Sequence, residues 1–357
     1  MKILHIYPQL NSGGTEMVIY NILRYCGSED YSFELLTEAP GDNEEKFSEL
    51  GIPIHHLPMQ DKNTYFNSLV NFFTAGDYSV VHVHMNHHLP LVLRAAKKVG
   101  IRCRIAHSHN ARLDLPQIVW KLLYIKHHSF EKFATHFIGC SKLALKWLFP
   151  SKWKDGKVIQ NGIPMDEFKF NPQIRTSIRN KLGILPNTKV FINVGRCTTQ
   201  KNQQFILDLA DKRKKNDELY LIVGEGPDLE KLKFYAEEKE LKNVRFLGKR
   251  NDVANLLMGA DIFLFPSLYE GLGIVAIEAQ AAGMNVISSD QIPSEADLHL
   301  GNFNPLSLKQ ADLWHNAMDG ELVSDNKRFE ISHQAYTSSY NINNSVIELK
   351  KIYDSNL

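Results

Sequence analysis

The stretch from Phe265 to Asp290, FPSLYEGLGIVAIEAQAAGMNVISSD, constrains the fold of this chain more than any other. Residues 261–265 form an apolar run that predicts a buried parallel strand. A polar loop with two glycines follows at 267–273, and residues 274–282 have good helix propensity. The next strand is predicted at 285–289. A strand, loop, helix and strand in this order are typical of an open α/β sheet.

Two glutamates, Glu270 and Glu278, lie on either side of the predicted loop–helix junction. This junction is at the carboxyl end of a strand, where open α/β sheets bind ligands. Gly271 and Gly273 leave the backbone bare, so amides at the helix start can approach a phosphate. A carboxylate would repel that phosphate but accepts hydrogen bonds from hydroxyl groups. The segment therefore indicates a ligand with hydroxyls at two ends and phosphates between them, as in a nucleotide sugar. The alternative is one turn residue and one ordinary helix-surface residue.

The pattern S-x-x-E-G-x-G-x-x-x-x-E-A, which starts at Ser267, resembles the E-x7-E signature of the retaining GT-B glycosyltransferases of family 4, the glycogen-synthase-like group. The resemblance implies that Glu270 binds hydroxyls of the donor sugar and Glu278 binds the ribose. The donor-binding residues that it implies in this segment are Glu270, Gly271, Leu272, Gly273, Ile274 and Glu278.

Composition narrows the class of protein. A chain of 357 residues predicts about two domains. With 43% hydrophobic and 23% charged residues and a net charge of +1, it is an ordinary globular protein with no overall attraction to nucleic acid. The four cysteines are isolated, which favours buried thiols over disulfides or a zinc site. Neither a cleavable signal pattern nor an apolar run of about 18 residues occurs, so we expect a cytoplasmic protein, attached at most to the inner face of a membrane.

Strand and helix patterns alternate along the chain, which predicts the α/β class. The expected architecture is GT-B, two Rossmann-like doubly wound domains that face a central cleft. A turn signal at Asn161-Gly162-Ile163-Pro164 places the boundary there. Residues 1–163 would form the acceptor domain and 164–339 the donor domain, and the resemblance implies that the last helix, within 340–357, returns to the first domain. After Asp290 we expect irregular chain and then helices near 307–318, 327–338 and 342–353.

Two adjacent glycines, Gly13 and Gly14, follow the first predicted strand and precede a helix. Such a loop suits an anion bound by backbone amides, although glycine turns before helices are common. The third glycine of G-x-G-x-x-G is absent, which argues against a dinucleotide site. In the family that the chain resembles, Gly14 corresponds to a position that meets the donor diphosphate.

Arg196 and Lys201 follow the predicted strand 189–195 and are five residues apart. A guanidinium fork and an ammonium point charge suit a diphosphate, and a solvated basic loop is the alternative. The run G-R-x4-K-N resembles the family's diphosphate-binding motif. These two cations would carry the charge that a bound metal otherwise supplies, so we expect no metal and no other cofactor.

Histidines gather near the ends of two predicted strands. They are His82, His84, His87, His88, His107 and His109. No carboxylate or cysteine joins them at ligand spacing, which argues against a metal site. His109 follows a strand end, and the resemblance places a histidine here beside the transferred sugar, although its follower is Asn110 rather than Asp or Thr. For His84, a place in the cleft and a structural role both stay open.

Residues 102–157 are locally basic, with eleven Lys and Arg against three acidic residues. Within them, segment 116–154 interleaves basic residues with Trp, Phe, Tyr and Leu, which is typical of an interfacial helix on anionic lipid. A packed helix pair with a solvated basic side is the alternative.

We therefore predict a retaining, metal-independent glycosyltransferase. It would move a hexose or N-acetylhexosamine from a nucleotide-diphosphate sugar, expected to be a UDP-sugar, to a hydroxyl of a glycan or lipid-linked glycan. The chain resembles bacterial enzymes that build exopolysaccharide, capsule or lipopolysaccharide, and the residues expected at the chemistry are His109, Glu270, Arg196 and Lys201.

Three alternatives come from other classes of protein. A nucleotide-sugar epimerase of similar two-domain fold would not be expected to carry E-x7-E. A nucleotide-linked oxidoreductase would need the missing glycine. A non-catalytic binding module would tolerate the loss of Arg196, Lys201 or Glu270, yet all three are present.

Overall fold

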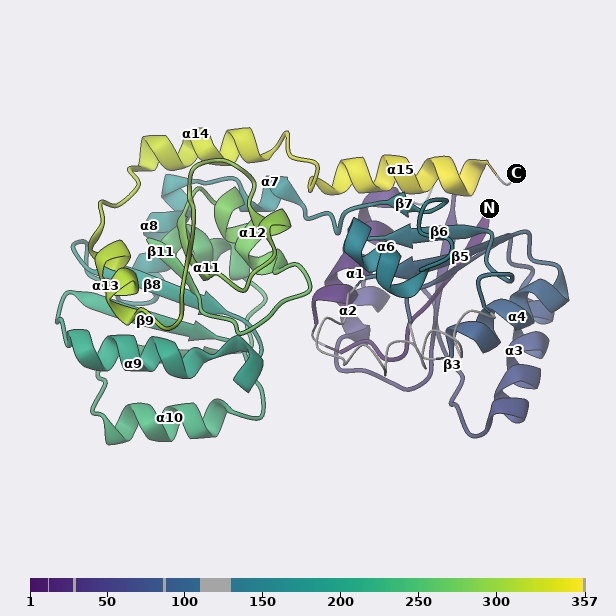
Figure 1. Ribbon diagram of the computed structural model, residues 1–357, viewed down its shortest axis with the longest axis horizontal. Helices are drawn as coiled ribbons and strands as arrows, with labels where there is room; N and C mark the ends of the chain where they lie inside the picture. The colour runs from purple at the N-terminus through teal and green to yellow at the C-terminus, as the bar shows by residue number, and fades with distance from the viewer. Residues whose placement is uncertain (12, 28–29, 86–87, 110–129, 356–357) are drawn as a thin grey trace. The chain divides into compact units, whose positions relative to one another are not determined.

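The computed structural model describes residues 1–11, 13–27, 30–85, 88–109 and 130–355 (Figure 1). The chain divides into two compact units. The first comprises Met1–Ile163 together with Ser339–Leu357, and the second comprises Pro164–Ser338. The sequence places the boundary between 163 and 164 and the return to the first domain at 340.

The first unit contains a parallel sheet of seven strands in the order β3-β2-β1-β4-β5-β6-β7. Its strands are β1 (Lys2–Ile6), β2 (Ser32–Thr37), β3 (Ile54–His56), β4 (Val80–Val83), β5 (Cys103–Ser108), β6 (His136–Gly139) and β7 (Lys157–Val158). Its described helices are α1 (Gly14–Cys26), α2 (Glu44–Ser48), α3 (Lys62–Gly76), α4 (Leu89–Val99), α6 (Lys142–Leu148) and α15 (Ile342–Asp354). The strand order reverses between β1 and β4, so this pair is the topological switch point of the sheet.

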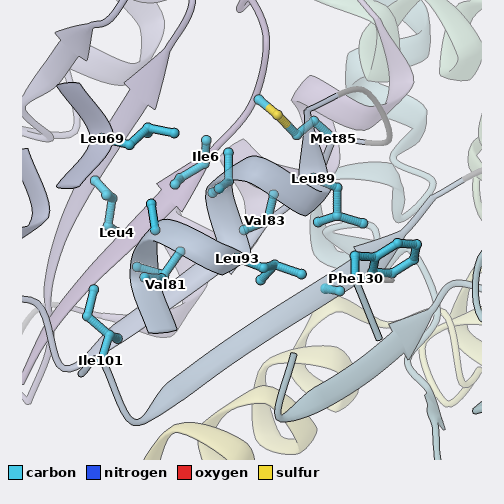
Figure 2. Close-up of a cluster of buried hydrophobic side chains, with 14 of the residues drawn as sticks. Leu4, Ile6, Leu69, Val81, Val83, Met85, Leu89, Leu93, Ile101 and Phe130 are labelled. Atoms are coloured by element: carbon cyan, nitrogen blue, oxygen red, sulfur yellow. The ribbon is translucent and has the colours of Figure 1, made fainter. Parts of the chain in front are cut away.

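One face of this sheet packs on α3 and α4, which lie side by side (Figure 1). Leu4 and Ile6 of β1 and Val81 and Val83 of β4 are buried in the same apolar cluster as side chains of these helices (Figure 2). Because side chains alternate along a strand, the residues between them face the other side of the sheet. On β1 and β4 that other side carries histidines.

Helix α15 belongs to the first unit and lies against α1. Ile163 joins the segment before it through two backbone hydrogen bonds, from its N–H to the Tyr340 carbonyl and from the Ile342 N–H to its own carbonyl (2.8 and 2.9 Å). Near the end of the helix, the Tyr31 hydroxyl donates to Asp354 (2.7 Å). These contacts hold α15 over the first sheet, beside the face that carries the histidines.

The second unit contains a parallel sheet of six strands in the order β10-β9-β8-β11-β12-β13. Its strands are β8 (Lys189–Val194), β9 (Glu218–Val223), β10 (Val244–Gly248), β11 (Ile262–Phe265), β12 (Asn285–Ser289) and β13 (Phe303–Leu306). Its helices are α7 (Met165–Phe168), α8 (Pro172–Lys181), α9 (Gln203–Arg213), α10 (Leu229–Glu238), α11 (Val253–Gly259), α12 (Ile274–Ala281), α13 (Ala311–Asp319) and α14 (Asp325–Ala335), with 3₁₀ turns η1 (Thr199–Lys201) and η2 (Ser294–Ala296). Here the order reverses between β8 and β11, which makes this pair the switch point.

The last strand, β13, corrects the prediction of irregular chain after Asp290. Residues Phe303–Leu306 pair in parallel with β12, and Pro305 stands opposite Ser288. The sequence FNPL lacks a strand signal because it is short and contains proline, which has no N–H for a sheet. An edge position tolerates that proline because only one side of the strand is paired.

Several helices begin at polar side chains that accept hydrogen bonds from the first free amides, as N-caps do. These caps are Asp61 for α3, Ser141 for α6, Asn171 for α8, Ser324 for α14 and Asn341 for α15. All four cysteines are buried and none forms a disulfide, as predicted. Within the described ranges, no helix combines the length and the apolar character needed to cross a membrane.

Candidate active site

In the second unit, the loops that follow β8 and β11 form a single layer at the switch point. The Asn202 side-chain amide donates to the Pro266 carbonyl (3.1 Å), and the Leu268 N–H donates to the Gln200 carbonyl (2.8 Å). The Gln200 side chain in turn donates to the carbonyl of Tyr269 (2.9 Å). These bonds fix the relative positions of the two loops, so the charged residues on them have defined neighbours.

The charged residues meet in one ion pair. Lys201 Nζ lies 2.6 Å from Glu270 Oε1, and the two side chains are 19% and 9% exposed. The ammonium also lies 5.3 Å from the centre of the Phe265 ring, within the range of a cation–π contact. Lysine has three N–H donors and a carboxylate has several acceptor sites, so each partner keeps capacity for a ligand. The sequence assigned these residues to different parts of the donor, and the structure couples them directly.

Arg196 follows the end of β8 and is exposed. Its backbone carbonyl accepts a hydrogen bond from the Gln203 side chain (3.2 Å). Across the described parts of the chain, no hydrogen bond or ion pair involves its guanidinium group. This side chain therefore has all its donors available for an anion.

The start of α12 lies beside this layer of loops and depends on one glycine. Gly273 has φ +84°, and a Cβ there would lie 2.9 Å from the Phe265 ring, so the position needs glycine. Leu272 is buried while Gly271 is exposed, which anchors the loop and leaves its backbone open. The first amides of the helix lack partners within it, and such amides bind anions. Ile274 is the first residue of the helix.

Glu278 lies within α12, in its second turn, and is half-buried. The predicted arrangement of one carboxylate before the helix and one inside it is therefore present. The structure brings Arg196, Lys201, Glu270 and the start of α12 to the carboxyl ends of the neighbouring strands β8 and β11.

In the first unit, Gly14 is the first residue of α1, and the buried side chain of Glu16 folds back toward the preceding glycine. A Cβ at Gly13 would lie 2.5 Å from Glu16 Oε2. Burial raises the pKa of Glu16, while hydrogen bonds from backbone amides and from the Tyr7 hydroxyl act in the opposite direction. The chain's own carboxyl group thus lies next to the glycine loop that the sequence assigns to a diphosphate.

His109 follows β5 and is buried, with both ring nitrogens engaged. Nδ1 lies 3.0 Å from Asn161 Oδ1, and Nε2 lies 2.8 Å from His84 Nδ1. Burial lowers the pKa of His109 to about 4, because an imidazolium loses its hydration there. The ring is therefore neutral at physiological pH.

The other predicted histidines separate into two groups. His82, His84 and His107 are buried beside His109, whereas His88 binds Glu38 (Nδ1 to Oε1, 2.6 Å) and His87 lies outside the described residues. His5 of β1 also joins the buried group, although the sequence prediction omitted it. A signal was available, because His5 alternates with apolar residues in the first strand as His82 does in β4, and the two are paired in register.

Two sets of three histidines bring ring nitrogens within 4.8 Å of one another, His5 with His82 and His84, and His84 with His107 and His109. Neighbouring rings are stacked, at 4.1 Å for His82 and His84 with an angle of 30° between their planes. Other neighbouring rings are tilted, by 42° for His5 and His82 and by 40° for His84 and His107. As placed, the nitrogens are hydrogen-bonding partners of one another.

The described part of the basic segment 116–154, residues 130–154, uses most of its aromatic side chains for packing. Phe130 and Phe149 are buried in the first core, and Phe133, Trp147 and Trp153 pack against it. This arrangement favours the packed alternative for residues 130–154. Residues 116–129 of the segment lie outside the described residues.

Comparison with known proteins gives two family matches. Residues 12–167 match the family described as Glycosyltransferase Family 4, and residues 174–313 match the family described as Glycosyl transferases group 1.

Curated relatives cover most of the chain. EpsF of Bacillus subtilis, named as a glycosyltransferase, is 29% identical and covers 87% of this chain and 84% of its own length. The UDP-Gal:alpha-D-GlcNAc-diphosphoundecaprenol alpha-1,3-galactosyltransferase of Escherichia coli is 29% identical and covers 80% and 78%. The capsular polysaccharide biosynthesis glycosyltransferase CapH of Staphylococcus aureus is 26% identical and covers 99% of both chains.

Among solved structures, HepE of Anabaena in complex with UDP is similar with a TM-score of 0.82 at 18% identity. The similarity covers 99% of this chain and 100% of HepE. At this identity the likeness concerns the fold, which is two Rossmann-like parallel sheets.

Proposed function

The chain belongs to the GT-B glycosyltransferases, with a family 4 domain followed by a group 1 domain, and on this basis we propose that it is a retaining enzyme that uses a UDP-sugar. The transferred sugar is a hexose or an N-acetylhexosamine. The acceptor is a hydroxyl of a glycan or lipid-linked glycan in the biosynthesis of a bacterial surface polysaccharide.

The observation that carries this proposal is the Lys201–Glu270 ion pair beside the exposed Arg196 and the start of α12. Arg196 and Lys201 bind the diphosphate and neutralise its charge as it leaves. Glu270 is held by Lys201 and accepts hydrogen bonds from sugar hydroxyls, and Glu278 accepts them from the ribose. Backbone amides from Gly271 to Ile274 face phosphate oxygens.

The nature of the donor and acceptor is supported by what the relatives are named for. HepE has been crystallised with UDP and with UDP-glucose, and the E. coli relative is named for UDP-Gal and a diphosphoundecaprenol-linked GlcNAc. In the proposed reaction, the bond between the anomeric carbon and the diphosphate oxygen breaks, the acceptor oxygen attacks from the same face, and the acceptor's proton passes to the leaving diphosphate. The sugar passes through an oxocarbenium-like state, and Gly14 and His109 of the first unit take part as donor-diphosphate and sugar neighbours.

The experiment is a panel of UDP-, GDP- and dTDP-sugars, tested for thermal stabilisation of the protein and for hydrolysis or transfer. We expect UDP-sugars to stabilise the wild type and Arg196→Ala to lose that stabilisation. Lys242→Ala is the matched control, because Lys242 is an exposed cation just before β10, at the amino end of a strand of the same sheet, whereas Arg196 follows the carboxyl end of β8.

Products distinguish the alternatives. A sugar transferred with its α configuration kept, read by NMR of the anomeric proton, supports the proposal. Inversion of that configuration contradicts retention, and isomerisation of a UDP-sugar with no acceptor present would establish the epimerase alternative instead.

Although the aromatic side chains within 130–154 pack into the first core, we also propose that the cations of the basic segment 116–154 bring the enzyme to anionic membrane, where a lipid-linked acceptor lies. Its support is the cluster of cations, since each Lys or Arg near such a surface contributes about 1 kcal/mol. Sedimentation with anionic vesicles at low salt should pull down the protein, and neutral vesicles should not. Equal sedimentation with both kinds of vesicle would refute the idea.

A further inference from the structure

Five buried histidines, one tyrosine and one asparagine of the first unit are connected by hydrogen bonds. On one side, His5 Nδ1 lies 2.9 Å from His84 Nε2. His84 Nδ1 lies 2.8 Å from His109 Nε2, and His109 Nδ1 lies 3.0 Å from Asn161 Oδ1. These contacts form a line from β1 through β4 and β5 to the end of the first sheet.

The other side passes through the last helix. His107 Nδ1 lies 3.1 Å from His82 Nε2, and His82 Nδ1 lies 2.9 Å from the Tyr353 hydroxyl. That hydroxyl also lies 3.5 Å from His5 Nε2, which joins the two sides. The result is one unbroken line of six hydrogen bonds, from His107 to Asn161, which we call the histidine chain.

The direction of the histidine chain follows from its end at Asn161. A carbonyl oxygen only accepts, so His109 carries its proton on Nδ1. A neutral imidazole has one N–H, so His109 Nε2 accepts from His84 Nδ1. By the same argument His84 carries its proton on Nδ1, so its Nε2 accepts from His5 Nδ1. The Nε2 atom of His5 then carries no proton.

At Tyr353 the direction is settled by what each choice leaves unpaired. If the hydroxyl donates to His5, it accepts from His82 Nδ1, and His107 donates from Nδ1 to His82. Only the bare Nε2 of His107 is then without a partner, and this atom is the one ring nitrogen of the five that is buried with no hydrogen bond among the described residues. If the hydroxyl donated to His82, His107 would bury an unpaired N–H and His5 an unpaired acceptor, which is costlier.

We propose that His84 is a positioning residue for sugar transfer: it holds the ring of His109 neutral, in one tautomer and in one orientation. His5 and Tyr353 act in turn through His84. This inference rests on the proposed function, in which His109 borders the reacting sugar. Among the described residues, His84 is the group that forms a hydrogen bond with His109 Nε2.

Neutrality matters for the proposed chemistry. An oxocarbenium-like sugar gains positive charge, and an imidazolium beside it would repel that charge. Because both nitrogens of His109 are engaged, the ring is not free to exchange a proton with the acceptor hydroxyl. His109 therefore serves as an uncharged wall of the site, and the histidine chain keeps it so.

The first test needs no activity. In protein labelled with ¹⁵N-histidine, ring nitrogen shifts at neutral pH should show all five histidines in the Nδ1–H tautomer, assigned through single His→Gln variants. A ring of His84 or His109 that is protonated on Nε2, or that is charged, would overturn the inference.

The second test compares two replacements of His84. His84→Leu removes donor and acceptor at similar volume, and it should lower kcat about tenfold, since a buried nitrogen of His109 loses its partner. The donor KM should change less than about threefold, because His84 does not bind the donor. His84→Gln retains one donor and one acceptor and should recover most of the loss. Tyr353→Phe, which removes one hydroxyl farther along the chain, should lower kcat by about threefold.

The control variant is His55→Leu, because His55 belongs to β3, binds Glu34 and is outside the histidine chain. Its kcat should equal that of the wild type. A His84→Leu enzyme with unchanged kcat, or a His84→Gln enzyme as impaired as His84→Leu, would overturn the positioning role. A wild type that transfers no sugar, yet shows five Nδ1–H tautomers, would refute the proposed function and the positioning role while establishing the histidine chain itself.

Discussion

Both units place polar side chains toward the carboxyl ends of neighbouring parallel strands, yet with opposite electrostatics. On β1, β4 and β5 of the first sheet, and just past the ends of β4 and β5, five imidazoles are buried and neutral because burial lowers the pKa of each. At the switch point of the second sheet, Arg196 is exposed and Lys201 is paired with Glu270. The polar groups of the first unit are neutral rings joined by hydrogen bonds, whereas those of the second unit carry full charges.

This contrast separates what the fold decides from what the residues decide. Strand order directs ligands to the carboxyl ends of the strands in both units. The side chains there decide whether those ends bind an anion or exclude charge. A diphosphate needs cations with access to solvent, and an oxocarbenium-like sugar is better served by a neutral wall. In the proposed reaction the charged residues of the second unit bind the diphosphate, and the neutral histidines of the first unit border the sugar.

The largest expected effect is the response of the first unit to acid. The folded pKa values, about 3 for His5 and about 4 for His109, lie below the ordinary value of 6.5. Below about pH 6.5 the unfolded chain therefore binds protons that the folded chain excludes, so stability is fully present above that pH and is lost as the pH falls toward 4. Each ring contributes a slope of about 1.4 kcal/mol per pH unit, and five rings together give several kcal/mol.

Hydrogen exchange, corrected for its intrinsic pH dependence, checks this prediction strand by strand. Between pH 7 and pH 5, the free energy of opening should fall steeply for β4 and β5 of the first unit. Strands β8 and β11 of the second unit are the internal control and should change much less. An equal change in both sheets would abolish the contrast between them.

The second prediction separates the two glutamates of the second unit's candidate site. A hydrogen bond to a charged group contributes roughly 1.5–3 kcal/mol, so each loss corresponds to about tenfold to a few hundredfold. Glu270→Gln should lower kcat by this factor and leave UDP affinity almost unchanged. Glu278→Gln should weaken binding of UDP itself. Calorimetric titration with UDP, beside steady-state kinetics, decides between them, and equal losses in both quantities for both variants would refute the assignment.

The third prediction separates the two cations. Arg196→Ala and Lys201→Ala should each weaken UDP binding by about tenfold or more. They should be non-additive, because both serve the diphosphate. Only Lys201→Ala should also lower thermal stability, by up to about 3 kcal/mol, because it leaves the largely buried carboxylate of Glu270 without a partner.

A double-mutant cycle checks the structural part of that claim. Adding Glu270→Gln to Lys201→Ala should restore most of the lost stability, since no buried charge is then left unpaired. Arg196→Ala should keep the melting temperature of the wild type, as surface substitutions do. Equal destabilisation by the two cation variants would show that the ion pair does not distinguish them.

The sequence predicted most strands and helices because their apolar runs and turn residues are distinct. The strand 285–289 has the predicted bounds, and the predicted strands 189–195 and 261–265 and helix 274–282 agree with the observed elements to within one residue at each end. The prediction of irregular chain at β13 was wrong. Neither the length of this segment nor its proline carries a strand signal, and its pairing depends on an edge strand, β12, that exists only in the assembled sheet.

The candidate site, like the fold, could be predicted from local sequence only in part. Spacing within one loop predicted that Arg196 and Lys201 lie together, and likewise Glu270 and Glu278. The contact between Lys201 and Glu270 joins residues 69 apart, and it exists because β8 and β11 are neighbours in the sheet. Strand order cannot be deduced from the local pattern of either segment. For the same reason the histidine chain was not predictable, since it joins three strands to a tyrosine of the last helix.

The smallest expected effect, no change at all, concerns divalent metal. If Arg196 and Lys201 supply the positive charge that the leaving diphosphate needs, EDTA should leave UDP binding and turnover within about twofold of the untreated enzyme. Magnesium or manganese should likewise add nothing to the wild type. The Arg196→Ala variant sharpens the test, because a cation missing from the diphosphate site can then be replaced: magnesium should partly restore its UDP affinity. Activity of the wild type that collapses in EDTA and returns with magnesium or manganese would refute the metal-free mechanism. It would also show that the charged site of the second unit is incomplete without an ion, so that its contrast with the neutral histidines of the first unit would no longer come from side chains alone.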